Sequence, residues 1–82
     1  MKIIDVGNKY TYLEGHINGS VNIPYDELIS NYRKYLNKEE NYYLYCKSGK
    51  LSKRAAMILS SIGYKVFVLK IWYKNIIIMT CI

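Results

Sequence analysis

The chain has 82 residues, which is enough for one small domain of modest stability. Half of the residues are apolar, so we expect the chain to fold, and the formal net charge is +6. The cations are scattered among tyrosine, asparagine and isoleucine, without an aromatic and basic repeat or a groove-reading element, so we expect tolerance of anions and no nucleic-acid partner.

The two cysteines, Cys46 and Cys81, are too few and too far apart to indicate a disulfide framework. With the single histidine, His16, they form no zinc pattern, and we expect no metal and no cofactor. Asp5 interrupts the first apolar run, which argues against a signal peptide, and the apolar tail 76–82 is far shorter than the roughly 20 residues that span a bilayer. A cytoplasmic protein with no membrane span is therefore expected, and its oligomeric state stays open.

The first half of the chain predicts two short strands around a turn-rich connection. Residues 3–6 are apolar enough for a strand, and residues 20–23 predict a shorter one that ends at Pro24. Between them we expect a helical turn over 10–14, followed by a segment whose glycines, Gly15 and Gly19, permit positive φ values.

The second half predicts a longer alternation of helices and strands. Apolar residues recur at three and four positions from Tyr25 to Leu36, which predicts one amphipathic helix. After a polar turn we expect a strand over 42–45, a helix over 52–62 that ends at Gly63, and a last strand over 65–69. Apolar strands that alternate with helices predict an α/β fold, an open parallel sheet flanked by helices.

Cys46 follows a middle strand of this sheet, at the carboxyl end where open α/β sheets bind ligands. The short loop that follows can direct its backbone N–H groups at the sulfur, and four cations surround it: Lys47, Lys50, Lys53 and Arg54. Such surroundings favour a thiolate, the reactive form of cysteine. The alternative is a cysteine that packs in the core as a small hydrophobe.

Other side chains have two interpretations each. Asp5 is a candidate general base, although a carboxylate at a strand end more commonly accepts loop N–H groups. Ser48 and Ser52 are candidate donors to a bound oxyanion, and Ser52 is also favoured as the N-cap of the following helix. Cys81 is a candidate resolving cysteine for Cys46, but its apolar tail favours a residue without a chemical role.

Three segments together resemble the rhodanese homology domain, and the match covers nearly everything from Ile4 to Lys70. Ile4-Asp5-Val6 and residues 12–24, Y-L-E-G-H-I-N-G-S-V-N-I-P, resemble its signature D-V-R…E-x-x-x-G-H-I-x-G-A-x-N-I-P. Residues 45–52, Y-C-K-S-G-K-L-S, with Ala55, Ala56 and Leu59 resemble the catalytic Y-C-x-x-G-x-R-S-x-x-A-A-x-x-L, and residues 63–69 resemble G-Y-x-V-x-x-L.

The resemblance implies a sulfurtransferase or persulfide carrier that moves sulfane sulfur from a donor such as thiosulfate to a thiol or cyanide. Carried over by position, Cys46 is the nucleophile, and the substrate-binding loop consists of Lys47, Ser48, Gly49, Lys50, Leu51 and Ser52. Asp5 and His16 would give structural support, and a catalytic role for His16 is the less favoured alternative. Relatives with a longer loop act on phosphate or arsenate esters, so the short loop favours sulfur transfer.

The chain departs from the family pattern at several positions. Leu51 replaces the loop arginine, Gly7 replaces the arginine of D-V-R, and the strand and helix usual before Ile4 are missing. The pattern L-x-G-G-Y-x-x-W becomes L-K-I-W-Y-K-N-I over 69–76, so the family's last helix is expected to be lost. We therefore expect a rhodanese-like domain over 1–70 and an atypical apolar tail over 71–82, which could pair as an edge strand, pack on a partner or promote aggregation.

Two classes of function remain open. The favoured one is a rhodanese-type sulfurtransferase, weakened by the loss of the loop arginine, with a small anionic sulfur donor and a thiol or cyanide acceptor. A protein is a further candidate acceptor. The alternative is a catalytically weak rhodanese-like module that binds or regulates a partner.

Overall fold

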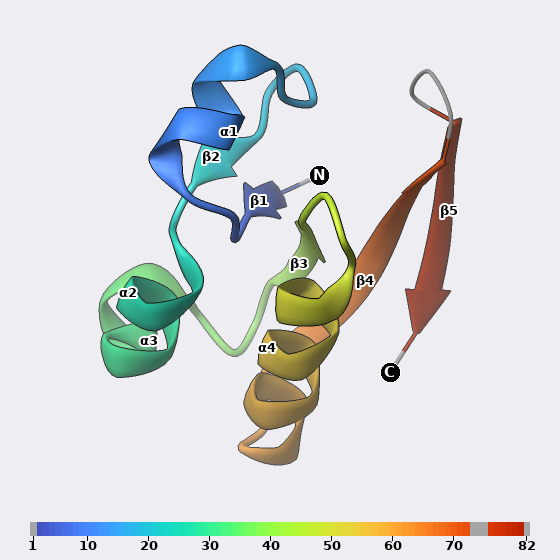
Figure 1. The fold of residues 1–82 in the computed structure, drawn as a ribbon. Coiled ribbons are helices and arrows are strands. Elements are labelled where there is room, and N and C mark those ends of the chain that lie inside the picture. The colour runs from blue at the N-terminus through green and yellow to red at the C-terminus, as the bar shows by residue number, and fades with distance from the viewer. Residues whose placement is uncertain (1, 73–75, 82) are drawn as a thin grey trace.

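The computed structural model describes residues 2–72 and 76–81, with side chains as far as Lys70. Its elements follow in the order β1 (Lys2–Asp5), α1 (Lys9–Glu14), β2 (Val21–Asn22), α2 (Tyr25–Ser30), α3 (Tyr32–Tyr35), β3 (Asn41–Tyr45), α4 (Lys50–Ser61), β4 (Lys65–Trp72) and β5 (Ile76–Cys81) (Figure 1). None of the helices in this part of the chain is long and apolar enough to cross a membrane.

The strands form one sheet in the order β2-β1-β3-β4-β5. The first four are parallel, which confirms the predicted open parallel sheet, while β5 pairs antiparallel with β4 at the edge. Of the three arrangements considered for the apolar tail, pairing as an edge strand is the one observed. The new strand extends β4 past the predicted end at Leu69, because Lys70, Ile71 and Trp72 gain backbone partners on β5.

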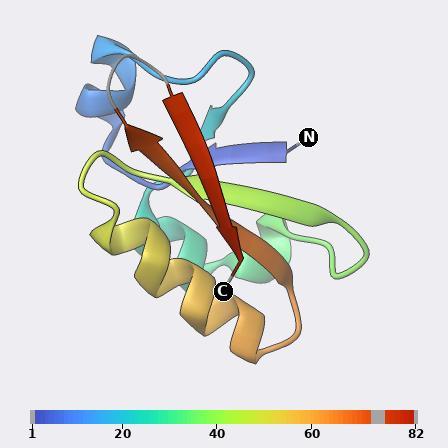
Figure 2. The ribbon, with the colours of Figure 1, turned by 90° about the vertical axis from the view of Figure 1, so that its right-hand side faces the viewer.

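Three helices, α2, α3 and α4, lie on one side of the sheet, and α1 lies beyond the carboxyl ends of the strands (Figure 2). Alternate strand residues face these helices, so the buried core contains Ile4, Leu44 and Val66 together with Leu28 and Leu59 of the helices. Fully burying an aliphatic side chain of this kind contributes about 1.5–3 kcal/mol. This packing fixes β1 and β3, the two strands that lead into the candidate site.

The single helix predicted over 25–36 is wrong, because two shorter helices occupy this segment. Asn31 leaves the helical region with φ −132° and ψ 35°, and its N–H and side-chain amide both bond to the carbonyl of Glu27. Asparagine competes in this way with helix hydrogen bonding. The break still allows both Leu28 and Leu36 to be buried.

The last helix begins two residues earlier than predicted, at Lys50. Its N-cap is Gly49, whose φ of +80° is a left-handed conformation that glycine adopts readily. Ala55, Ala56 and Leu59 face the core, whereas Ile58 and Ile62 are exposed. The early start places the first backbone N–H groups of α4 next to Cys46.

Candidate active site

Cys46 follows β3, at the place where successive strands begin to be added on the other side of β1. From β1 the chain goes first to β2 on one side and then to β3 on the other, so β1 and β3 are the central neighbours. The backbone is joined immediately beyond these strands, where Val6 donates its N–H to the carbonyl of Tyr45 at 2.9 Å. A ligand of an open α/β sheet binds at such a reversal, beyond the carboxyl ends of the strands.

The Cys46 sulfur is bordered by two serine hydroxyls. Sγ donates to Oγ of Ser52 at 3.6 Å and lies 3.9 Å from Oγ of Ser48. Ser48 also accepts the Lys50 N–H at 3.2 Å, and Ser52 donates to the Gly49 carbonyl at 3.1 Å, so both hydroxyls are held by the loop itself. The loop thereby places two polar side chains on one sulfur atom.

The pKa of Cys46 lies below its ordinary value. Burial is the largest single influence and raises the pKa, since a thiolate is poorly solvated in the protein interior. The backbone N–H and hydroxyl of Ser52, the hydroxyl of Ser48 and the backbone N–H of Leu51 lower the pKa and together outweigh burial. The thiolate is thus favoured by oriented hydrogen-bond donors at the start of α4.

Cys46 also has features of the alternative interpretation, a cysteine that packs in the core as a small hydrophobe. The residue is only 6% exposed and belongs to the buried core cluster with Val6, Leu44 and Ala55. It is a free thiol. The sulfur is therefore packed against apolar side chains on one side and hydrogen-bonded by the loop on the other, so access to it is narrow.

The four cations predicted around the loop differ in their surroundings, and the lowered pKa of Cys46 comes from hydrogen bonds. Lys47 Nζ forms an ion pair with Oε1 of Glu14 at 3.3 Å, which joins the loop to the end of α1 and offsets the Lys47 charge. The side chains of Lys50, Lys53 and Arg54 are exposed. The sequence predicted positive charge around the loop but gave no sign that a carboxylate of α1 would pair with one of these cations.

The prediction that Ser52 is the N-cap of α4 is wrong. Gly49 is the N-cap, without a side-chain capping bond, and Ser52 lies in the third position of the helix, fully buried. Its hydroxyl is consequently directed at Cys46 and at the Gly49 carbonyl. Leu51, which stands where the resembling family has arginine, is 38% exposed beside the loop.

Asp5 organises the end of β1. Its buried carboxylate accepts the N–H of Gly7 at 2.8 Å, and its backbone carbonyl accepts the Ile23 N–H and the Asn22 side-chain amide. A Cβ on Gly7 would lie 3.0 Å from Oδ1 of Asp5, so the arginine of the family pattern would not fit this backbone without a shift.

His16 remains in the turn before β2. Nδ1 lies 2.8 Å from the carbonyl of Tyr12, and the two rings stack with centroids 3.8 Å apart. The Tyr12 hydroxyl in turn donates to the carbonyl of Ser20 at 2.7 Å. These bonds hold the turn together and direct Nδ1 at backbone. The side chain of Cys81 lies outside the described residues.

Tyr45 is a supporting residue whose role the sequence did not indicate. Its buried hydroxyl accepts the Ile17 N–H at 3.0 Å and lies 3.0 Å from Oγ of Ser20. Because Ser20 donates its own proton to the Ile17 carbonyl, Tyr45 donates to Ser20. Burial raises the pKa of Tyr45, which keeps this donor protonated. The signal for this role in the sequence was that Tyr45 directly precedes Cys46.

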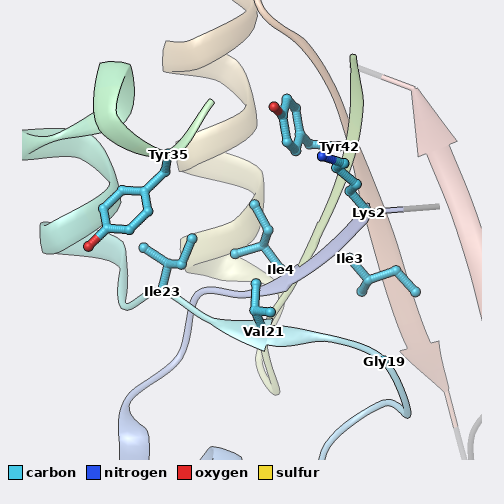
Figure 3. A pocket seen from close by; sticks show the side chains of 8 residues that line it. All are labelled: Lys2, Ile3, Ile4, Gly19, Val21, Ile23, Tyr35 and Tyr42. Carbon is cyan, nitrogen blue, oxygen red and sulfur yellow. The ribbon is translucent and has the colours of Figure 1, made fainter. Parts of the chain in front are cut away.

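A pocket of about 410 Å³ lies at the opposite end of the sheet (Figure 3). It is lined by Lys2, Ile3, Ile4, Gly19, Val21, Ile23, Tyr35 and Tyr42, several of which begin β1, β2 and β3. Its polar groups are engaged elsewhere: Lys2 pairs with Glu40 at 2.7 Å, and the Tyr35 hydroxyl donates to Glu27. Cys46 is not one of the residues that line the pocket, so the pocket is separate from the candidate site.

The chain is similar to several known proteins. The family model of the rhodanese-like domain matches residues 1–76. A curated relative from Bacillus subtilis (strain 168), "Putative sulfur carrier protein YrkF", is 34% identical over 65 residues, which are 79% of this chain and 35% of the relative.

Two crystal structures are also similar. A rhodanese-related protein from Thermoplasma volcanium is 30% identical with a TM-score of 0.74, over 82% of this chain and 66% of that one. A rhodanese-like domain protein from Staphylococcus aureus is 29% identical with a TM-score of 0.71, over 79% and 63%. The chain thus spans about a third of the curated relative and somewhat under two thirds of these structures.

Proposed function

The chain belongs to the rhodanese-like domain family, and from this premise we propose that it is a sulfurtransferase or persulfide carrier with Cys46 as the nucleophile. The observation that carries the proposal is the setting of the Cys46 sulfur, which two serine hydroxyls and the first N–H groups of α4 hold at a lowered pKa. The curated relative is named as a sulfur carrier, which supports sulfur chemistry in particular.

The first step loads sulfur onto the enzyme. The Cys46 thiolate attacks the outer sulfur of thiosulfate, a new S–S bond forms, and the original S–S bond breaks with its electron pair leaving on sulfite. The product is a Cys46 persulfide anion, and the total charge is unchanged. The backbone N–H groups of Leu51 and Ser52 already point toward Sγ and stabilise the attacking thiolate.

The second step returns the sulfur to an acceptor. An acceptor thiolate, or cyanide, attacks the outer persulfide sulfur and takes it, while the bond to Cys46 breaks and its thiolate is restored. The N–H groups of Leu51 and Ser52 and the hydroxyl of Ser48 are placed to stabilise that departing thiolate. Because Cys46 must begin and end as a free thiol, we also propose a reducing, cytoplasmic location.

A steady-state assay tests the proposal. Protein, thiosulfate and cyanide are mixed, and thiocyanate is measured over time for the wild type and for Cys46→Ser. We expect thiocyanate to form with the wild type at a rate proportional to enzyme and to stay at the uncatalysed level with the variant. Equal rates for both proteins would refute Cys46 as the nucleophile.

One observation favours the second candidate function, a catalytically weak binding or regulatory module. Leu51 presents an aliphatic side chain beside the loop, and Lys47 is partly neutralised by Glu14, so few fixed charges remain to hold a small oxyanion. In that case the loop would bind its partner with no sulfur transferred.

A further inference from the structure

The two edges of the sheet differ in how they are protected from further pairing. β2 forms one edge and β5 the other, and each pairs with a single neighbour among the described residues. β2 has only two residues, and Pro24 follows two positions after its end. A very short strand beside a proline is a poor template for another strand, so this edge is protected.

β5 has neither of these protections. It runs for six residues, Ile76–Cys81, and every one of them has a partner in the antiparallel ladder with β4. In Figure 2, which looks at this side of the molecule, β5 lies in front of the other elements. The outer edge of such a strand presents a row of backbone N–H and C=O groups with which another strand can pair.

The composition of β5 also favours pairing with another strand. Residues 76–82 contain no charged residue, proline or glycine, although the chain as a whole has 12 lysines and arginines and a net charge of +6. Charged side chains, lysine above all, are a common means of keeping edge strands apart. The neighbouring strand β4 has Lys65 and Lys70, whereas β5 has no cation that would repel a copy of itself.

We propose that β5 pairs with β5 of a second copy of the chain, so that two five-stranded sheets join into one sheet of ten strands. The inference goes beyond the proposed function and does not depend on it. Two identical strands pair antiparallel about a two-fold axis, so one strand supplies both halves of the interface. A second copy also matches β5 in length and in its lack of charge.

Pairing of this kind ends at two copies. The dimer uses both β5 edges, and the edges that remain at the two ends of the joined sheet are the short β2 strands. An interface in which both subunits use the same surface gives a closed assembly. We therefore expect a dimer and no open-ended fibre.

The dimer leaves both candidate sites open. Cys46 follows β3, and β4 separates β3 from β5 in the sheet. A two-fold axis perpendicular to the joined sheet places the Cys46 loops of the two copies at opposite ends of it. Any activity per chain should consequently be the same in the monomer and in the dimer, so failure of the sulfurtransferase proposal and failure of the dimer are separate results.

Sedimentation of the full-length protein over a range of protein and salt concentrations tests the proposal. We expect an equilibrium between monomer and dimer that shifts toward the dimer as salt rises, because salt screens the repulsion between two copies of net charge +6. A monomer at every concentration, an oligomer larger than a dimer, or a dimer that weakens as salt rises would overturn the proposal.

Matched substitutions locate the contact. Ile77→Lys and Val21→Lys each add one positive charge, the first on β5 and the second at an exposed position of β2, on the opposite edge. We expect Ile77→Lys to weaken the dimer about fivefold, because like charges on paired strands repel. Val21→Lys should leave the dimer unchanged. An equal effect of the two variants would overturn the assignment to β5.

Amide hydrogen exchange of the unaltered protein provides a measurement that does not depend on how a variant folds. Along an antiparallel strand, alternate residues direct their N–H groups to opposite sides. Dilution from dimer to monomer should therefore accelerate exchange at every second residue of 76–81, while the residues bonded to β4 stay slow. If the outward N–H groups exchanged rapidly at all protein concentrations, or if the protection appeared on β2, the proposal would be wrong.

Discussion

The hydroxyl of Ser52 and the sulfur of Cys46 lie 3.6 Å apart, and their hydrogen bond reverses when the thiol ionises. In the thiol form Cys46 donates to Ser52, which gives its single proton to the Gly49 carbonyl. In the thiolate form Ser52 can turn that proton toward the sulfur. The Gly49 carbonyl keeps a partner, since it also accepts the Lys53 N–H at 3.1 Å.

Ser52→Ala should therefore raise the pKa of Cys46. The variant removes one hydrogen-bond donor to the thiolate, while burial continues to raise the pKa as before. We expect alkylation by iodoacetamide at neutral pH to slow several-fold, with the rate recovering at higher pH. Ser61→Ala, which removes an exposed hydroxyl from the other end of α4, is the control and should leave the pH profile unchanged. Identical profiles for wild type and Ser52→Ala would contradict the role of this hydroxyl.

Leu51→Arg should improve the use of thiosulfate. A guanidinium beside the loop offers paired N–H donors to an oxyanion, which the exposed aliphatic side chain of Leu51 does not. We expect KM for thiosulfate to fall about tenfold, while the loop N–H of residue 51 is retained. Leu51→Gln separates charge from side-chain length. An unchanged KM in the arginine variant would show that Leu51 does not limit donor binding.

Glu14→Gln should release the positive charge of Lys47. Both side chains are largely exposed, so the pair adds little to stability, and the urea midpoint should change only slightly. An anionic donor should nevertheless bind more tightly at low salt, and this gain should fade as salt screens the free ammonium. A salt-independent gain in affinity would contradict an electrostatic origin.

Tyr45→Phe should destabilise the fold near the site. The variant removes the acceptor of the part-buried Ile17 N–H and the donor to the buried Ser20, at a cost of about 1–3 kcal/mol in free energy of unfolding. Tyr43→Phe is the matched control, because the Tyr43 ring stacks on Phe67 through its aromatic face and retains that contact. Urea denaturation of both variants measures the difference, and equal midpoints would argue against Tyr45 as an anchor.

Removal of residues 76–82 tests the proposed division into a domain over 1–70 and a tail. β5 pairs with β4 from Phe67 to Trp72, so its loss leaves that edge of the sheet without a ladder partner. We expect a lower melting temperature by circular dichroism and a greater tendency to aggregate. An unchanged melt would mean that the tail adds nothing to the fold.

The sequence predicted the four parallel strands and the place of Cys46, because the longer strands are mainly apolar and the connections have a helical period or clear turn residues. It missed features that depend on competition between local bonds. Asn31 broke a helix whose apolar spacing was continuous, and Gly49 took the capping position that Ser52 was expected to fill.

Other features depend on side chains that meet only in the fold. Glu14 and Lys47 are 33 residues apart in the chain, and Ile17 and Tyr45 are 28 apart, so no local pattern marks either contact. The strand β5 was one of three arrangements left open, because an apolar run of that length does not specify its partner.

The most direct test of the account is the intact mass of the protein after incubation with thiosulfate and, separately, with glutathione persulfide. We expect the wild type to gain one sulfur atom that cyanide removes, and Cys46→Ser to gain none under the same conditions. A wild-type mass that both donors leave unchanged, or an equal gain in the two proteins, would contradict Cys46 as the carrier of sulfur.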